Sequence, residues 1–126
     1  MSDDKLKYEM KVTSIGPLVK EFVDAGILVF FGPEIPEELV EFSIVHEHGP
    51  LRSEVAPGDL ILIDDEPFEV LAVGEVANKN LANLGHLILK ANGRTEPELP
   101  GDVCVEAKPL PPVKVGTVVK ILEGDS

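Results

Sequence analysis

Short apolar stretches alternate along this chain with turns rich in glycine and proline, and helical periodicity is weak. Apolar runs of about four to eight residues between such turns are typical of β-strands. The pattern also places a hairpin turn at Asp64-Asp65-Glu66-Pro67, between two apolar runs. In all we expect about eight strands: Tyr8–Ile15, Ile27–Phe31, Phe42–His48, Leu60–Ile63, Phe68–Val73, Leu87–Lys90, Val103–Glu106 and Thr117–Ile121.

Two segments have helical signals instead. Pro17–Ala25 opens with proline near its first turn and ends before Gly26, and Ala77–Leu84 ends before Gly85. Proline at the start and glycine just past the end are the usual punctuation of helices. Many short strands with two brief helices predict a mainly β fold, a small closed or partly open β-barrel.

Two turns have the same residues. Pro57-Gly58-Asp59 and Pro100-Gly101-Asp102 each precede a predicted strand, and Gly116 stands similarly before the last one. A Pro-Gly turn directs the chain into the strand that follows it. Recurrent turn chemistry explains this echo better than a duplicated unit does.

Length and charge narrow the class of function. The 126 residues predict one domain, 1–126, with one core. The net charge of −12 argues against a nucleic acid or an anionic membrane surface as the main partner. It favours a small molecule, a metal ion or a basic protein.

The apolar runs, the first residues and the cysteine content predict the cellular location. Its longest apolar runs are too short to cross a bilayer, and Met1 to Lys11 has no signal-peptide core. Cys104 is the only cysteine, which excludes a disulfide framework and a thiolate zinc cluster. We expect a cytosolic protein without direct membrane insertion.

The main candidate for chemistry is a pair of histidines in the predicted strand Phe42–His48. Side chains alternate along a strand, so Phe42 and Ile44 share one face with His46 and His48. Gly49-Pro50 ends the strand directly afterwards. The pattern predicts both imidazoles at the rim of the core, where reactive groups are held and still reached.

Three interpretations of the pair compete. In the first, His46 and His48 bind a metal ion together with Glu54 or His86, in a cupin-like β-barrel enzyme. The spacing from His48 to Glu54 is longer than the cupin motif expects, and a second cupin motif is not found. In another interpretation, the two histidines are merely solvated polar groups at a strand end.

The remaining interpretation makes one imidazole a nucleophile toward phosphorus, which requires no cofactor. Neutral imidazole is a good nucleophile near pH 7. Such a ring needs a hydrogen bond at its other nitrogen and donors for the phosphoryl oxygens. The second histidine, Arg52 and the N–H groups of the Gly49 turn are candidates for these donors. His86 lies at the end of the second helix, where capping is at least as good an explanation as catalysis.

Taken together, these segments resemble the glucitol/sorbitol-specific IIA component of the bacterial sugar phosphotransferase system. The resemblance runs from about Tyr8 to Leu122, and its most specific part is Asn80–Leu87, which matches an Asn-Leu-x-x-Leu-Gly-His block. The other shared segments are Thr13–Gly16, Ile44–Gly49, Pro57-Gly58, Val70–Ala77, Pro100-Gly101 and Gly116–Lys120.

The resemblance implies a cytoplasmic β-barrel that accepts a phosphoryl group from the phosphocarrier protein HPr. It would pass the group to the IIB part of a sorbitol permease that also contains IIC. In the family's His-x-His-Gly motif the first histidine carries the phosphoryl group, which is His46 here. His48 would then hold the phosphoryl oxygens or the ring. Glu47 is an unexpected charge between the two, and alternation should point it away from the site.

Overall fold

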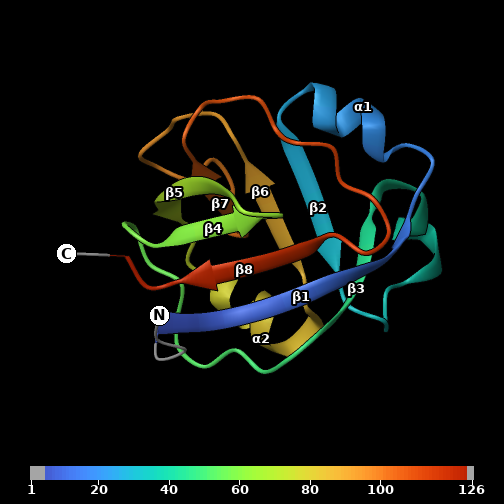
Figure 1. The fold of residues 1–126 in the computed structure, drawn as a ribbon, viewed down its shortest axis with the longest axis horizontal. Coiled ribbons are helices and arrows are strands. Elements are labelled where there is room, and N and C mark those ends of the chain that lie inside the picture. The colour runs from blue at the N-terminus through green and yellow to red at the C-terminus, as the bar shows by residue number, and fades with distance from the viewer. Residues whose placement is uncertain (1–4, 125–126) are drawn as a thin grey trace.

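The computed structural model describes residues 5–124, and within them eight strands close into a barrel (Figure 1). Around the barrel the order is β1-β3-β2-β6-β7-β5-β4-β8. The predicted small β-barrel is therefore confirmed, in its closed form. The strands are β1 (Leu6–Ile15), β2 (Ile27–Phe31), β3 (Ile44–His48), β4 (Leu60–Ile63), β5 (Glu66–Val73), β6 (Leu87–Lys90), β7 (Asp102–Val105) and β8 (Val118–Leu122).

The barrel is mixed, with parallel pairing at β2–β3 and β6–β7 and antiparallel pairing between its other neighbours. Along the chain, helix α1 (Val19–Asp24) connects β1 to β2, and α2 (Ala77–Leu84) connects β5 to β6. The two helices sit toward opposite ends of the barrel (Figure 1). The hairpin predicted between β4 and β5 is present, and both Asp64 and Asp65 have positive φ in its turn.

One predicted strand begins later than expected. Residues Glu37–Phe42 form a 3-10 helix, η2, so β3 starts at Ile44 and not at Phe42. The ring of Phe42 packs instead against Phe22 of α1, with ring centroids 5.8 Å apart. Apolar contact with α1 thus removes Phe42 from the strand face on which alternation had placed it.

Apolar side chains from all eight described strands fill the barrel interior, where Phe30 and Phe68 are among the largest fully buried ones. Tyr8 and Met10 of β1 are buried in the same cluster. None of the helices within residues 5–124 has the length and hydrophobicity needed to span a bilayer. Because large apolar side chains fill the interior of the barrel, this interior is a packed core and not a channel.

The turns with similar sequences that precede β4, β7 and β8 share one hydrogen-bonding scheme. The Oδ2 atoms of Asp59 and Asp102 accept the backbone N–H three residues earlier, at 2.8 and 3.1 Å. Each also pairs at 2.8 Å with a lysine ammonium, that of Lys7 and that of Lys90 respectively. At Thr117 the hydroxyl accepts the N–H three residues earlier in the same way, at 3.1 Å. Common turn chemistry thus accounts for the sequence echo.

Candidate functional site: a histidine pair at the barrel end

Strand β3 presents His46 and His48 side by side, with ring centroids 5.3 Å apart and planes at 65°. In the ladder with β1, His46 lies opposite Val12 and His48 lies opposite Met10. His46 is 0% exposed, whereas His48 is exposed. The barrel surface therefore passes between the two residues. At the predicted rim of the core, His48 is exposed and His46 is fully covered.

The His46 ring is held by one backbone carbonyl and surrounded by apolar groups. Its Nε2–H donates to the carbonyl of Gly85 at 2.8 Å, and its ring meets Phe30 edge-on at 6.1 Å. Among the described residues none offers Nδ1 a hydrogen bond. Burial lowers the pKa of His46, and proximity to His48 lowers it further, against the opposing effect of the Gly85 carbonyl. His46 is accordingly neutral near pH 7, with its free lone pair inside the protein.

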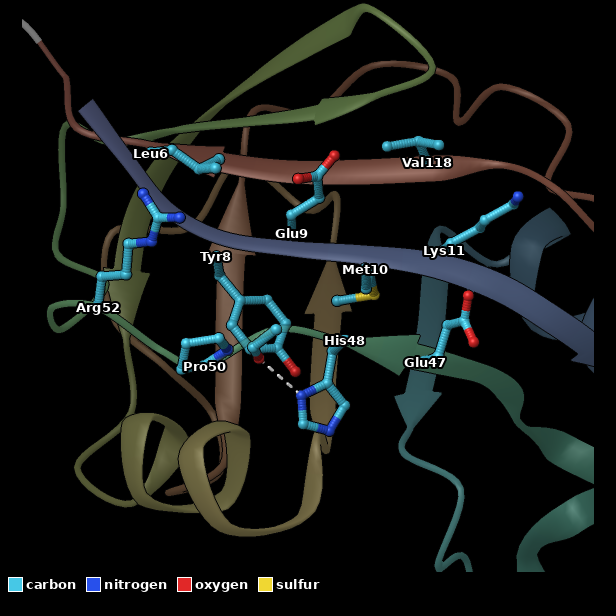
Figure 2. Close-up of a pocket in the computed structure, with 11 residues that line it drawn as sticks. Leu6, Tyr8, Glu9, Met10, Lys11, Glu47, His48, Pro50, Arg52 and Val118 are labelled. Atoms are coloured by element: carbon cyan, nitrogen blue, oxygen red, sulfur yellow. Dashed lines mark hydrogen bonds between the residues drawn. The ribbon is translucent and has the colours of Figure 1, made fainter. Parts of the chain in front are cut away.

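The His48 ring is fixed differently and faces solvent. Its Nδ1–H donates to the carbonyl of Gly49 at 2.8 Å, which leaves the lone pair on Nε2 in the neutral ring. One face of the ring stacks on Tyr8, with centroids 5.5 Å apart and planes at 26° (Figure 2). A hydrogen bond and a stacked ring together hold the orientation of this imidazole.

Two glycines form the walls beside Nε2 of His48. A Cβ added to Gly85 would lie 3.0 Å from that atom and 3.0 Å from Cε1 of His46, and a Cβ added to Gly32 would lie 3.3 Å from Nε2 of His48. Gly85 ends α2 with a φ of 64°, and Gly32 follows β2. The N–H of Gly32 donates to the Leu84 carbonyl at 2.9 Å, which ties the two glycine segments together.

Sequence reasoning recognised Gly85 as a helix cap but did not foresee that Gly85, Gly32 and Tyr8 surround the histidine pair. Only the glycine that follows a helix had a signal of its own in the sequence. The positions of Gly32 and Tyr8 depend on the strand order, because β3 lies between β1 and β2 in the barrel. These three residues come together from three separate parts of the chain.

The third histidine is anchored to β2. The half-buried His86 donates from Nδ1 to the carbonyl of Phe30 at 3.1 Å. Its ring stacks on Phe31 at 4.5 Å. His86 thus fastens the end of α2 to the strand beside the pair, through a carbonyl of β2 rather than one of its own helix.

The three-ligand set of the metal interpretation is not assembled. Glu54 contributes its backbone carbonyl to the Lys7 ammonium, at 2.8 Å, and its side chain is exposed. Within residues 5–124, no group of three His, Cys, Asp or Glu side chains is placed to hold a metal ion. His46 and His48 therefore have neither Glu54 nor His86 as a third ligand in this arrangement.

A hollow of about 420 Å³ adjoins the Tyr8–His48 stack on the outer side of β1 and β3 (Figure 2). Arg52 and Lys11 line it at opposite ends. Glu47 lies opposite Lys11 in the ladder and points away from the His48 ring. The expected alternation of Glu47 is confirmed, which reduces its repulsion of an anion at the imidazole.

The fold and the site together define a class: a closed β-barrel with two adjacent imidazoles, each with one nitrogen fixed by a backbone carbonyl. A family model for the glucitol/sorbitol-specific IIA component of the phosphotransferase system (PTS) matches residues 7–120. This chain therefore belongs to the glucitol/sorbitol-specific IIA component family of the PTS, as the sequence resemblance indicated.

Individual relatives support the same family assignment. The glucitol/sorbitol-specific EIIA components of Shigella flexneri and of Escherichia coli strain K12 are each 35% identical over 114 residues, which is 90% of this chain and 92% of theirs. The crystal structure of a PTS IIA component from Enterococcus faecalis V583 has the same fold, with a TM-score of 0.79 at 24% identity. That similarity covers 90% of this chain and 98% of the other.

Proposed function

We propose that this chain is a cytoplasmic phosphocarrier of the PTS whose histidine pair receives a phosphoryl group from the phosphohistidine of HPr. The chain then passes the group to the IIB component of a glucitol/sorbitol permease. The observation that carries the proposal is the exposed, oriented imidazole of His48 beside the buried imidazole of His46. An accessible ring with one nitrogen fixed and the other free is what phosphoryl transfer between two proteins requires.

The chemistry at this site is mainly positioning. A phosphoramidate donor and a phosphoramidate product have similar energies, so the protein gains rate by aligning the two rings and excluding water. Phosphoryl transfer passes through a loose transition state that needs little covalent assistance from the protein. The stacked Tyr8 and the Gly49 carbonyl provide such alignment for His48.

Within the pair, we propose that His46 carries the phosphoryl group and that His48 holds the phosphoryl oxygens or the ring. The family resemblance assigns the phosphoryl group to His46, and the spacing of the two histidines suggests the supporting role of His48. The geometry supports the pair as a unit, because the two rings lie 5.3 Å apart and share the Gly85 segment as a neighbour. His86 supports this segment through its hydrogen bond to β2.

Reconstitution tests the function. Membranes containing the IIB and IIC components are mixed with phosphoenolpyruvate, Enzyme I, HPr and labelled sorbitol, with or without this chain. We expect sorbitol phosphate to form only when the chain is present, and not with the His46→Gln/His48→Asn double variant. Equal sorbitol phosphate with and without the chain, in membranes free of any other IIA component, contradicts the proposal.

A further inference from the structure

We infer that the segment Leu84–His86 is a movable cover of His46, which opens before a phosphoryl group reaches this imidazole. The inference rests on the proposed function, in which His46 carries the phosphoryl group, and adds a step that precedes the transfer. Three observations carry it: the burial of the His46 ring, the hydrogen bonds that hold the segment, and the close packing at Gly32.

The closed arrangement blocks both nitrogens of His46. Its side chain is 0% exposed, and its Nε2–H donates to the Gly85 carbonyl at 2.8 Å. Its Nδ1 is buried without a hydrogen-bond partner among residues 5–124. In a transfer between two proteins the donor nitrogen, the phosphorus and the acceptor nitrogen must come into line. Neither nitrogen of His46 can be reached in this way, so a part of the chain has to move.

The connection between α2 and β6 is the part that can move. Strands β2 and β3 belong to the closed barrel, where each pairs with two neighbours. Gly85 and His86 lie in neither a helix nor a strand, and Gly85 has a φ of 64°. Leu84 is exposed and His86 is half-buried, so the segment lies at the molecular surface. It can therefore be displaced without opening the barrel.

Hydrogen bonds from the barrel side hold the segment in place. They run from Nε2 of His46 to the Gly85 carbonyl at 2.8 Å, from the N–H of Gly32 to the Leu84 carbonyl at 2.9 Å, and from Nδ1 of His86 to the Phe30 carbonyl at 3.1 Å. Each such bond contributes little net free energy, because water replaces it when it breaks. Opening the segment is thus a local event, far less costly than unfolding, and the open form is a minor state of the folded protein.

Opening also changes which nitrogen of His46 has a lone pair. In the closed form the Gly85 carbonyl keeps the proton on Nε2, which leaves the lone pair on the blocked Nδ1. Once the carbonyl withdraws, water reaches the ring and the proton can exchange between the two nitrogens. Burial lowers the pKa of His46, so the ring is already neutral near pH 7 when the cover opens. The cover therefore controls access to His46 and not its charge.

A methyl group at Gly32 acts as a wedge under the cover. A Cβ added there would lie 2.7 Å from the carbonyl oxygen of Leu84, which is too close for non-bonded atoms. Gly32 is not among the glycines with positive φ, so alanine adds no backbone strain of its own. We expect Gly32→Ala to push the segment outward. Gly101→Ala is the matched control, because its Cβ would meet only Nδ2 of Asn80, at an ordinary 3.5 Å.

Diethyl pyrocarbonate, which acylates neutral imidazoles, measures access without any partner protein. The reagent is kept below one modification per chain, tandem mass spectrometry separates the rates of His46 and His48, and circular dichroism checks folding. In the wild type we expect His46 to react at least about tenfold more slowly than the exposed His48, because it reacts only from the open form. Protonation does not explain such a lag, since burial keeps His46 neutral.

The wedge variant decides whether Leu84–His86 is the cover. We expect Gly32→Ala to raise the acylation rate of His46 about threefold or more, and Gly101→Ala to leave it unchanged. Equal rates for His46 and His48 in the wild type overturn the inference. So does a folded Gly32→Ala protein in which His46 reacts no faster than in the wild type.

A small phosphoryl donor links the cover to the transfer. Phosphoramidate phosphorylates histidines directly, and the site is assigned by tandem mass spectrometry. Since acylation and phosphorylation of His46 both require the open form, Gly32→Ala should raise both rates by the same factor. Faster acylation without faster phosphorylation overturns the inference and leaves the proposed function intact. A wild-type chain that takes up no phosphoryl group from fully charged HPr contradicts the proposed function, while the acylation rates still decide whether the cover exists.

Discussion

At the scale of single residues, two neighbouring histidines of one strand differ because only one of them is buried. Burial favours the neutral form of His46, whereas His48 extends past the barrel surface. Alternation was sufficient to find the pair and its shared face. It could not predict which ring is covered, because Gly85 and Gly32, which pack beside the rings, come from distant segments.

The buried ring of His46 makes stability depend on pH. Its pKa in the folded state lies below the ordinary value of 6.5, so the unfolded chain binds more protons in that range. Stability therefore rises with pH through this window and falls as pH drops below about 6.5, by at most about 1.4 kcal/mol per pH unit from this group. Urea unfolding of wild type and His46→Gln between pH 7.5 and 5.5 measures the effect.

His46→Gln is the control for the other titrating groups, because its carboxylates are the same as those of the wild type. We expect the wild type to lose more stability than His46→Gln on acidification. Equal losses in the two proteins would mean that His46 is protonated in the folded state as easily as in the unfolded chain.

At the scale of elements, the end of α2 is the part that brings the site together. Gly85 ends the helix in the left-handed region, and its carbonyl accepts from His46 while its Cα lies beside the His48 ring. The adjacent Leu84 carbonyl accepts from the N–H of Gly32. The helix and its glycine cap were predictable from the sequence. Their contact with β3 was not, because it depends on how the connections cross the barrel end.

Gly85→Ala tests this contact. A methyl group there meets the rings of His46 and His48 at 3.0 Å and also strains a backbone with a φ of 64°. We expect a loss of about 1 to 2 kcal/mol in stability and altered NMR shifts of both rings. Gly116→Ala is the matched control, since its φ is also positive, at 97°, but its Cβ would meet nothing within 4 Å. Unchanged histidine shifts in Gly85→Ala would contradict the described packing.

The lysine–aspartate pairs stabilise the turns that lead into strands. Lys7 binds Asp59 at 2.8 Å with both side chains nearly inaccessible. Lys7→Met leaves this carboxylate buried without its cation, so we expect a loss of about 3 kcal/mol or more in unfolding free energy. Lys11→Met, at an exposed position of the same strand, should change it by less than about 0.5 kcal/mol.

Urea midpoints of both lysine variants give the comparison. Similar stabilities for the two variants would show that the buried pair stabilises the fold no more than an exposed lysine does.

The turn sequence Pro-Gly-Asp could be recognised in the sequence, but its lysine partners could not. Lys7 and Asp59 are 52 residues apart, and only the closed barrel brings them into contact.

At the scale of the whole molecule, barrel closure and negative charge are the dominant features. Closing the sheet removes free strand edges, which suits the proposed role of a carrier that meets a donor and an acceptor without aggregating. The barrel class followed from strand number and turn spacing. The strand order could not be predicted in this way, because no local sequence signal indicates the parallel pairing of β2 with β3 and of β6 with β7.

The net charge of −12 affects encounter with the proposed donor. If HPr docks with a basic face, opposite charges speed its association, and added salt screens that attraction. We expect the second-order rate of transfer from phospho-HPr to fall when sodium chloride is raised from about 0.05 to 0.5 M. Rapid-quench kinetics measure this rate. A rate that is constant or rises with salt would contradict electrostatic steering.

As a proposed phosphocarrier, this barrel should carry a phosphoryl group on its histidine pair. The most direct measurement is the intact mass of the wild-type chain after incubation with phosphoenolpyruvate, Enzyme I and HPr, followed by acid or base treatment. We expect one added phosphoryl group per chain, lost in acid and retained in base as for phosphohistidine. An unchanged mass with HPr fully phosphorylated, or an acid-stable phosphate, would contradict it.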